Sequence, residues 1–433
     1  MKIKKLEKKV LLKNGLVVDF DNRDFIKKDI LIIDGKIREI KESINVGDDY
    51  KVYDLKGYVI SPGFIDVHVH FREPGYENAE TLETGSKAAL AGGFSHVFCM
   101  PNTEPPIDNA EMVKYVYERS ESLPINIYPI AAITKGRKGQ EITEMAEIAE
   151  FGAMAFSDDG SYVQNPLVMR LAMEYSKLVN RPIVDHAEDE LLKDNGVMNE
   201  SEVSTRLGLK GNPAVAEEIA VYRDIALAKF TGAHIHIAHV TTAKAVELIR
   251  KAKAEGVKVT AEVTPHHLVL TEDYMIDFDA NGKVQPPLRN KKDVEALIEG
   301  LKDGTIDIIA TDHAPHPIET KETTINEASS GMIGLESAFG LLVTHLVHER
   351  KIPLIDILEK ITINPMKIFN IPASGIEVGK EANVTIFDSD EWWIFKRENI
   401  YSKSYNTPFI GCELLGKVKH VINKNFISIM DNE

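Results

Sequence analysis

The chain has 433 residues, of which 43% are hydrophobic and 27% are charged, as is typical of an ordinary soluble globular protein. Its 51 basic and 67 acidic residues give a formal net charge of −16, which argues against nucleic acid or an anionic membrane as the main partner. The length exceeds what one hydrophobic core usually fills, so we expect one large barrel and a smaller domain.

Targeting and redox signals predict a cytoplasmic location. The N-terminal segment MKIKKLEKKVLLKNG carries charges without an apolar run, so no secretory signal is expected. No stretch approaches the roughly 18 consecutive apolar residues of a transmembrane helix. Cys99 and Cys412 are far apart in sequence and provide neither a disulfide framework nor a cysteine-rich zinc site.

Both ends of the chain show short strand patterns separated by turns. The candidate strands lie at residues 10–20, 28–40, 50–60, 382–390, 391–396 and 416–425. Asn14-Gly15 and Asp34-Gly35 are tight-hairpin signals between apolar runs. We therefore predict a small β-sandwich domain built from both chain ends, residues 1–60 and 367–433.

The middle of the chain, residues 61–366, alternates apolar strands with amphipathic helices. The strand candidates lie at residues 59–70, 95–102, 125–132, 152–159, 181–189, 233–240, 257–267 and 305–316. Helical segments lie between them, such as residues 78–93, where Gly92 and Gly93 are the stop signal. This α/β alternation favours a (β/α)₈ TIM-type barrel. A doubly wound open sheet is the alternative, but no glycine-rich phosphate loop follows the first strand.

Nearly every one of these strands ends in a residue that can bind metal or move protons. His68 and His70 lie two apart on the first strand, so both point toward the barrel mouth. Other strands end in Asp158-Asp159, Asp185-His186, His239 and Asp312-His313. Because active sites lie at the C-terminal strand ends of such barrels, these side chains predict one divalent-metal site. Histidines with carboxylates suit zinc, while manganese and cobalt are alternatives.

Two further residues indicate an anionic substrate. Arg72 follows the histidine pair and can bind a carboxylate through two parallel hydrogen bonds. Asn102 stands at the end of the second strand, where its amide faces the same mouth. In contrast, His234 and His236 lie mid-strand and are interpreted as structural or supporting residues. His266 and His267 are interpreted as supporting or packing residues.

The combined motifs resemble the dihydroorotases of the amidohydrolase superfamily. The matching stretches are SPGFIDVHVHFREPG at 61–75, AGGFSHVFCMPNTEPPIDN at 91–109, AFSDDGS at 155–161, VDHAED at 184–189, VTAEVTPHHL at 259–268 and DGTIDIIATDHAPH at 303–316. The resemblance implies reversible conversion between L-dihydroorotate and N-carbamoyl-L-aspartate in pyrimidine biosynthesis. It also implies one or two Zn²⁺ ions per subunit and a metal-bound hydroxide as nucleophile.

The resemblance assigns roles to individual residues. It implies the metal ligands His68, His70, Asp159, His186, His239 and Asp312, and Asp312 is also the general acid/base. It implies the substrate contacts His70, Arg72, Asn102, Gln285, His316, Ser330 and Gly331. Asp159 stands where many relatives carry a carboxylated lysine. Two departures affect the substrate side: Gln285 replaces the family's usual asparagine, and 328–331 lacks a proline often found before Gly331.

Other hypotheses remain open at the level of sequence. A hydantoinase, dihydropyrimidinase or allantoinase would share the fold and the metal, but its substrate would lack the carboxylate expected at Arg72. A weakly active homologue that scaffolds aspartate transcarbamoylase is a second alternative. The partners expected are the small-molecule substrate, aspartate transcarbamoylase as a further candidate, and other copies of the chain in a homo-oligomer.

Overall fold

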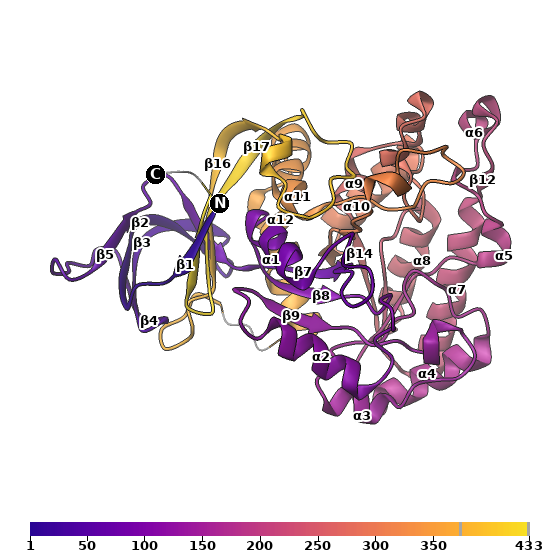
Figure 1. The fold of residues 1–433 in the computed structure, drawn as a ribbon, viewed down its shortest axis with the longest axis horizontal. Coiled ribbons are helices and arrows are strands. Elements are labelled where there is room, and N and C mark those ends of the chain that lie inside the picture. Colours follow the sequence, from indigo (N-terminus) through magenta and orange to yellow (C-terminus); the bar gives the residue numbers. More distant parts are fainter. Residues whose placement is uncertain (372–374, 431–433) are drawn as a thin grey trace.

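The computed structural model describes residues 1–371 and 375–430, and parallel strands form its central barrel (Figure 1). One three-stranded parallel sheet contains β7 (Phe64–Val69), β8 (Phe94–Cys99) and β9 (Asn126–Pro129). A four-stranded parallel sheet contains β10 (Ile183–Asp185), β13 (Ile235–Ile237), β14 (Val259–Val263) and β15 (Ile308–Ile309). These strands correspond to the expected ones, although several are shorter.

Single bridges join the two sheets into a closed barrel. Phe156 pairs in parallel with Ala131 on one side and with Ile183 on the other, so its segment is the remaining barrel strand. At the other seam Val69 pairs with His313, and the amide of His70 donates to the carbonyl of His313 over 2.9 Å. The (β/α)₈ barrel prediction is confirmed, and the closure places the C-terminal ends of all its strands around one mouth.

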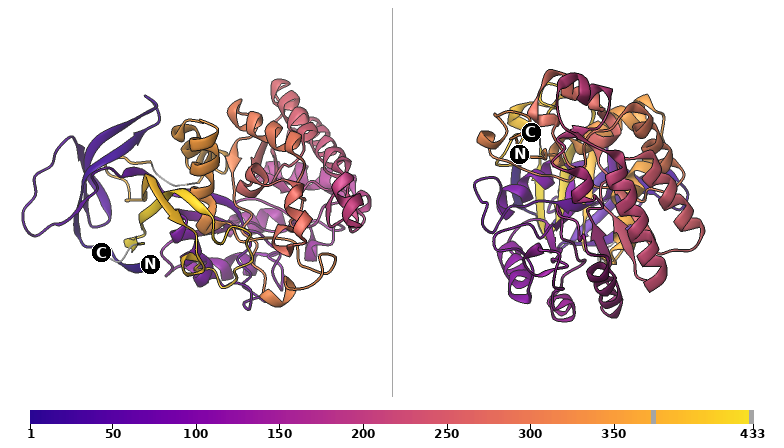
Figure 2. Two further views of the ribbon diagram at one scale, coloured as in Figure 1. Left: turned by 90° about the horizontal axis from the view of Figure 1, so that it is seen from above. Right: turned by 90° about the vertical axis from the view of Figure 1, so that its right-hand side faces the viewer.

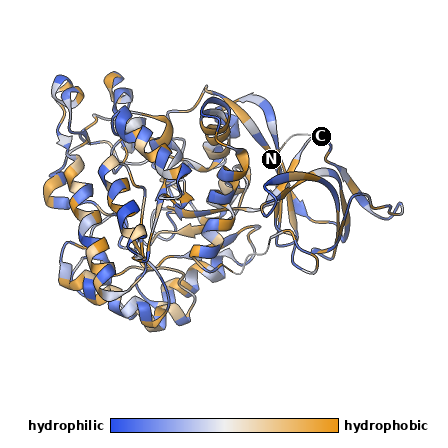
Figure 3. Ribbon diagram, turned by 180° about the vertical axis from the view of Figure 1, so that it is seen from behind, coloured by the Kyte–Doolittle hydropathy of each residue, from blue (hydrophilic) through white to orange (hydrophobic). Residues whose placement is uncertain are grey.

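Helices surround the strands (Figure 2). The longer ones are α1 (Leu82–Ala91), α2 (Ala110–Ser120), α4 (Pro166–Leu178), α7 (Ala214–Thr231), α8 (Ala243–Ala254), α10 (Lys291–Lys302) and α12 (Leu354–Ile361). Shorter ones are α3 (Met145–Glu150), α5 (Glu190–Lys193), α6 (Glu202–Leu207), α9 (Pro265–Val269), α11 (Leu335–Leu341) and α13 (Ile363–Ile368). The Thr81 side chain caps α1 at its N-terminus and Gly92 ends it, as the stop signal predicted. Most of these helices alternate polar and apolar positions (Figure 3).

The two chain ends build one additional nine-stranded sheet. Its order is β1 (Lys2–Lys5), β18 (Phe426–Ile429), β17 (Glu413–Asn423), β16 (Val384–Ile394), β6 (Val59–Pro62), β2 (Lys9–Asp19), β3 (Asp24–Ile33) and β4 (Lys36–Lys41), with β5 (Lys51–Asp54) on β2. The antiparallel pair β6–β16 joins the N-terminal strands to the C-terminal ones. The prediction that both ends contribute to one β unit is confirmed, whereas the exact division at residues 60 and 366 stays a prediction.

One of the two predicted hairpin turns is wrong. Asp34 and Gly35 both have positive φ and connect β3 to β4, as expected. Asn14 and Gly15 instead lie inside β2, at a register shift against β3. Asn14 has φ 62°, and its backbone N–H donates to Asp29 Oδ1 over 2.7 Å. The Asn-Gly signal therefore marks a bulge rather than a turn.

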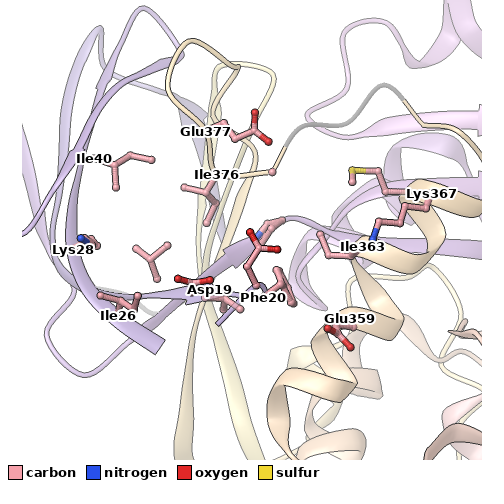
Figure 4. Close-up of a pocket in the computed structure, with 16 residues that line it drawn as sticks. Asp19, Phe20, Ile26, Lys28, Ile40, Glu359, Ile363, Lys367, Ile376 and Glu377 are labelled. Atoms are coloured by element: carbon pink, nitrogen blue, oxygen red, sulfur yellow. The ribbon is translucent and has the colours of Figure 1, made fainter. Parts of the chain in front are cut away.

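An aromatic cluster fastens the additional sheet to the barrel. The Phe64 ring on β7 lies 5.3 Å from Phe339 and 6.0 Å from Phe387 on β16, between ring centroids. A cavity of 530 Å³ lies between the additional sheet and the helices α12 and α13 (Figure 4). Its lining contains aliphatic groups and the charged Asp19, Lys28 and Glu377, but no histidine among the described residues. Within the described residues no helix is both long and apolar enough to span a membrane.

Candidate active site

The polar residues at the strand ends converge on a second cavity, of 230 Å³, at the barrel mouth. The predicted residues that line it are His70, Arg72, Asn102, Asp159, His186, His239, Gln285, Asp312, His316, Ser330 and Gly331. His68, the remaining predicted residue, is completely buried beside them on β7. The structure therefore brings the whole predicted set together, and it adds Arg137, which the sequence analysis did not single out.

Two overlapping groups of ligand atoms stand at the floor of this cavity. One consists of His68, Asp159 and His239, and the other of His68, His70 and Asp312. Within each group the potential ligand atoms lie within 4.8 Å of one another. His186 lies outside both groups, but its Nδ1 is 3.5 Å from Asp159 Oδ1. The arrangement offers nitrogen and oxygen donors from separate strands to one or two divalent cations.

Unsatisfied polar atoms support the assignment of a cation to these groups. Within the described residues, His68 Nε2 and Asp159 Oδ1 are buried without a hydrogen-bond partner. His68 Nε2 faces Asp159 Oδ1 over 3.5 Å and Asp312 Oδ1 over 3.4 Å. Buried polar atoms are rarely left unpaired, because each loses its hydration without compensation. A divalent cation between these atoms would accept their lone pairs, so the residues present fit a metal ion.

Of the two adjacent aspartates, only Asp159 faces the cavity. Asp158 accepts a hydrogen bond from the Thr134 amide over 3.0 Å and another from the Thr134 hydroxyl. Burial raises the pKa of Asp159, but nearby His68, His186 and His239 outweigh it and hold that pKa well below its usual range. Asp159 is therefore a carboxylate at neutral pH, as a metal ligand must be.

Glu262 on β14 is a residue that the sequence analysis missed. Its Oε1 lies 2.6 Å from His68 Nδ1, and its Oε2 lies 3.1 Å from His236 Nε2. Burial raises the pKa of Glu262, but His68 and His236 lower it to about 2. A carboxylate in this place fixes the ring of His68 and leaves Nε2 free for a metal. The signal in the sequence was one acidic residue within the apolar strand VTAEV.

The histidines expected to be structural or supporting lie near these contacts of Glu262. His234 Nε2 and His236 Nδ1 each lie 2.8 Å from Thr260 Oγ1, away from the cavity. His267 Nε2 lies 3.0 Å from the carbonyl oxygen of Pro286. His266 is buried, and its Nε2 has no hydrogen-bond partner within the described residues.

The opposite wall of the cavity is built around Arg72. Its Nε donates to the Pro315 carbonyl over 3.2 Å, and its Nη2 lies 3.4 Å from His316 Nε2. Burial lowers the pKa of Arg72 to about 10, so the guanidinium stays charged at neutral pH. Asn102 Oδ1 lies 2.8 Å from His70 Nδ1, which leaves the amide nitrogen of Asn102 to donate into the cavity. This wall suits a carboxylate.

The two departures from the family pattern are accommodated at the same wall. Gln285 reaches the cavity, where its Nε2 donates to the buried Glu188 Oε2 over 2.5 Å. Gly331 has φ 131°, and a Cβ there would stand 2.7 Å from the Cβ of Ala314, so the position requires glycine. Lys321 Nζ donates to the carbonyls of Ser329 and Gly331 over 2.8 and 3.0 Å, which fixes the loop without a proline.

Comparison with known protein families and sequences gives a consistent result. Residues 57–245 match the family model described as dihydro-orotase-like. A dihydroorotase from Pelotomaculum thermopropionicum is 47% identical over 408 residues, which cover 94% of this chain and 95% of that protein. A dihydroorotase from Syntrophus aciditrophicus is 44% identical over 412 residues, covering 95% of this chain and 96% of that protein.

Solved structures share the fold at lower sequence identity. The L-hydantoinase of Arthrobacter aurescens superimposes with a TM-score of 0.88 at 24% identity, covering 99% of this chain and 97% of that one. A dihydropyrimidinase from Brevibacillus agri gives a TM-score of 0.84 at 23% identity, covering 97% and 95%. At this identity the likeness establishes the barrel and its additional sheet, but not the substrate.

The Glu262–His68 contact predicts a dependence of metal affinity on a residue that is not a ligand. We expect Glu262→Gln, which keeps the shape and removes the charge, to weaken Zn²⁺ affinity about 10–100-fold. Competition with a chromogenic chelator measures this affinity without reference to turnover. Glu336→Gln is the control, because Glu336 is a buried carboxylate that accepts from the amides of Tyr401 and Ser402. Equal Zn²⁺ affinities in Glu262→Gln and Glu336→Gln would contradict a role of Glu262 in orienting His68 for the metal.

Proposed function

This chain belongs to the dihydroorotase family, and we propose that it interconverts L-dihydroorotate and N-carbamoyl-L-aspartate in pyrimidine biosynthesis. The observation that carries the proposal is that one cavity has potential metal ligands at its floor and a wall that suits a carboxylate. Asp159 and Asp312 lie on the floor, and Arg72 and His316 form the wall. A cyclic amide with a carboxylate substituent matches both features at once, whereas an uncharged ring uses only the first.

Substrate orientation would depend on the wall. Arg72 and the amide of Asn102 would bind the ring carboxylate, which places the scissile amide over the floor. His316 Nε2 lies 2.9 Å from the Ser330 carbonyl oxygen, and burial lowers the pKa of His316 to about 3. His316 therefore stays neutral near pH 7, its Nε2–H donates to the Ser330 carbonyl oxygen, and Nδ1 would remain as an acceptor for an N–H of the ring. The peptide groups at Ser330 and Gly331, with Gln285, would contact the ring.

Proton transfer is assigned to Asp312. His68, His70, Asp159, His186, His239 and Asp312 would hold one or two divalent cations, which we propose to be zinc. When bound, such a cation polarises an amide carbonyl and lowers the pKa of a water molecule. Burial raises the pKa of Asp312, but His68 and His70 outweigh it and hold that pKa below its usual range. The Asp312 carboxylate would accept a proton from the attacking water and pass it to the leaving nitrogen.

The direct test is turnover of dihydroorotate in both directions by protein reconstituted with Zn²⁺. We expect activity that a chelator removes, and a fall in kcat of about 10²–10⁴-fold or more in Asp312→Ala. Asp390→Ala, a change at an exposed residue of β16, should leave kcat unaltered. Metal-loaded protein that neither opens dihydroorotate nor closes carbamoyl aspartate would disprove the proposed function.

Arg72 distinguishes a dihydroorotase from a hydantoinase or dihydropyrimidinase. Loss of a charge-assisted bidentate contact in Arg72→Ala should raise KM for dihydroorotate by about 100-fold. Turnover of hydantoin or dihydrouracil, which have no carboxylate, would not depend on this residue. Steady-state kinetics with the three rings measures the difference, and Arg250→Ala, at an exposed residue of α8, is the control. A preference for uncharged rings that survives Arg72→Ala would favour the alternative.

A homo-oligomer is proposed from an apolar outer face on two helices that pack side by side, α4 and α7. Leu178 on α4 is 81% exposed, and Tyr222 and Phe230 on α7 are 64% and 69% exposed. Exposed apolar patches of this kind mark interaction sites. A second copy of the same face would cover it in a two-fold arrangement.

The pair of changes Ile219→Asp and Tyr222→Asp tests this interface, because both side chains lie exposed on α7. We expect light scattering to show an oligomer for the unchanged protein and a monomer for the double variant. Ile394→Asp, at an exposed residue of β16, is the control and should not change the mass. An unchanged mass in the double variant would place the interface elsewhere.

Two further proposals come from the family resemblance and the cysteines. We propose association with aspartate transcarbamoylase, which co-purification from the native host would test. We also propose a cytoplasmic location, which is supported by the free thiols of Cys99 and Cys412.

A further inference from the structure

Arg137 occupies the wall of the active-site cavity that adjoins the metal-binding floor. It ends a short 3₁₀ turn, Lys135–Arg137, that follows the barrel strand containing Ala131. Its Nε and Nη2 donate to the carbonyl oxygen of Asp158 over 3.3 and 3.2 Å. Nη2 also donates to Ser161 Oγ over 3.3 Å. These bonds fix the guanidinium beside the peptide that leads into Asp159.

The guanidinium has no carboxylate partner within the described residues. None of the ion pairs there includes Arg137 or Arg72, although both side chains line the cavity. Nη1 of Arg137 makes no hydrogen bond in the same part of the chain. The Arg137 backbone has φ 55°, a left-handed conformation that costs a side-chain-bearing residue energy. Asp158 and Asp159 lie near Arg137, as Asp312 and Asp159 lie near Arg72, but neither guanidinium forms an ion pair with them, so both keep N–H donors for an anionic ligand.

The proposed reaction changes the number of carboxylates on its substrate. Hydrolysis adds the oxygen of water to the amide carbon, breaks the carbon–nitrogen bond and gives the nitrogen a proton. The new carboxylic acid then loses its proton, so a ring with one carboxylate becomes an open chain with two. One carboxylate would remain at Arg72, and the new one forms where the amide stood, at the floor beside Asp159 and Arg137.

We propose that Arg137 binds the second carboxylate of the open-chain form, so that the cavity has one arginine for each end of a dicarboxylate. This assignment rests on the proposed function, because it names the reactant of that same site. Arg137 then determines the affinity for N-carbamoyl-L-aspartate and contributes little to the binding of the ring. Arg72 binds the carboxylate that the ring and the open-chain form have in common.

Steady-state kinetics in both directions separates the two reactants. Because the equilibrium constant is fixed, kcat/KM must change by the same factor in each direction, so KM is the informative quantity. In Arg137→Leu we expect KM for N-carbamoyl-L-aspartate to rise about tenfold or more, with KM for dihydroorotate within about twofold. Arg137→Lys should recover part of the loss. Lys138→Leu removes the same charge from an exposed neighbour and is the matched control.

Equilibrium binding provides a readout that does not require turnover. By calorimetry on the zinc-loaded protein, succinate should bind about tenfold more weakly to Arg137→Leu, while propionate, with one carboxylate, should bind equally to both. Equal KM increases for both reactants, or loss of bound zinc from Arg137→Leu, would show that Arg137 acts through the Asp158–Asp159 segment and would overturn the assignment. Unchanged KM values and succinate affinity would overturn it too. Absence of turnover in the unaltered protein would instead refute the proposed function.

Discussion

The site depends on one carboxylate that is shared by several imidazoles. Asp159 Oδ1 lies 3.5 Å from His68 Nε2, His186 Nδ1 and His239 Nε2, and Asp159 Oδ2 lies 3.5 Å from His70 Nε2. These distances exceed a good hydrogen bond, so the groups surround a common point rather than satisfy one another. A polar cluster this deeply buried is unfavourable by itself, and a cation of matching size converts it into a stabilising one. Binding of a metal by these groups would therefore be coupled to the folding of the barrel mouth.

Closure of the barrel makes that convergence possible. Asp66 on β7 accepts from the amides of His68 and Thr311 and from the Thr311 hydroxyl, which ties the first barrel strand to the last. The pair His68 and His70 is thereby fixed relative to Asp312, which stands about 240 residues later. Glu262 adds a second tie, from β14 to His68. The positions of the potential ligand atoms are thus set by backbone and carboxylate contacts behind them, and the cavity lies on their other side.

What could be predicted from sequence follows from the same geometry. Strand ends in a parallel barrel must meet, so polar residues that end successive apolar runs identify the floor of the site without knowledge of their contacts. Glu262 was not predicted because its role arises from a contact between two strands, which sequence spacing does not reveal. Arg137 was not predicted because it lies in a lysine-rich turn, where a charged side chain is usually exposed to solvent. At Asn14-Gly15 the local signal was read as a hairpin, but the tertiary contact with Asp29 holds a bulge inside a long strand.

At Gln285 and in the loop at 328–331, contacts behind the cavity wall hold the side chain and the loop in place. The Gln285 side chain is fixed because its amide nitrogen donates to Glu188 Oε2. Glu188 is fixed in turn, since its Oε1 accepts from Asn212 Nδ2 over 2.7 Å. In the loop at 328–331, the rigidity that a proline would give comes from Lys321, whose ammonium binds two loop carbonyls. Burial and nearby Lys283 lower the pKa of Lys321 to about 7, which is a cost of placing it there. In return, Lys321 fixes the loop, so that Ser330 and Gly331 keep their places at the edge of the cavity that Arg72 also lines.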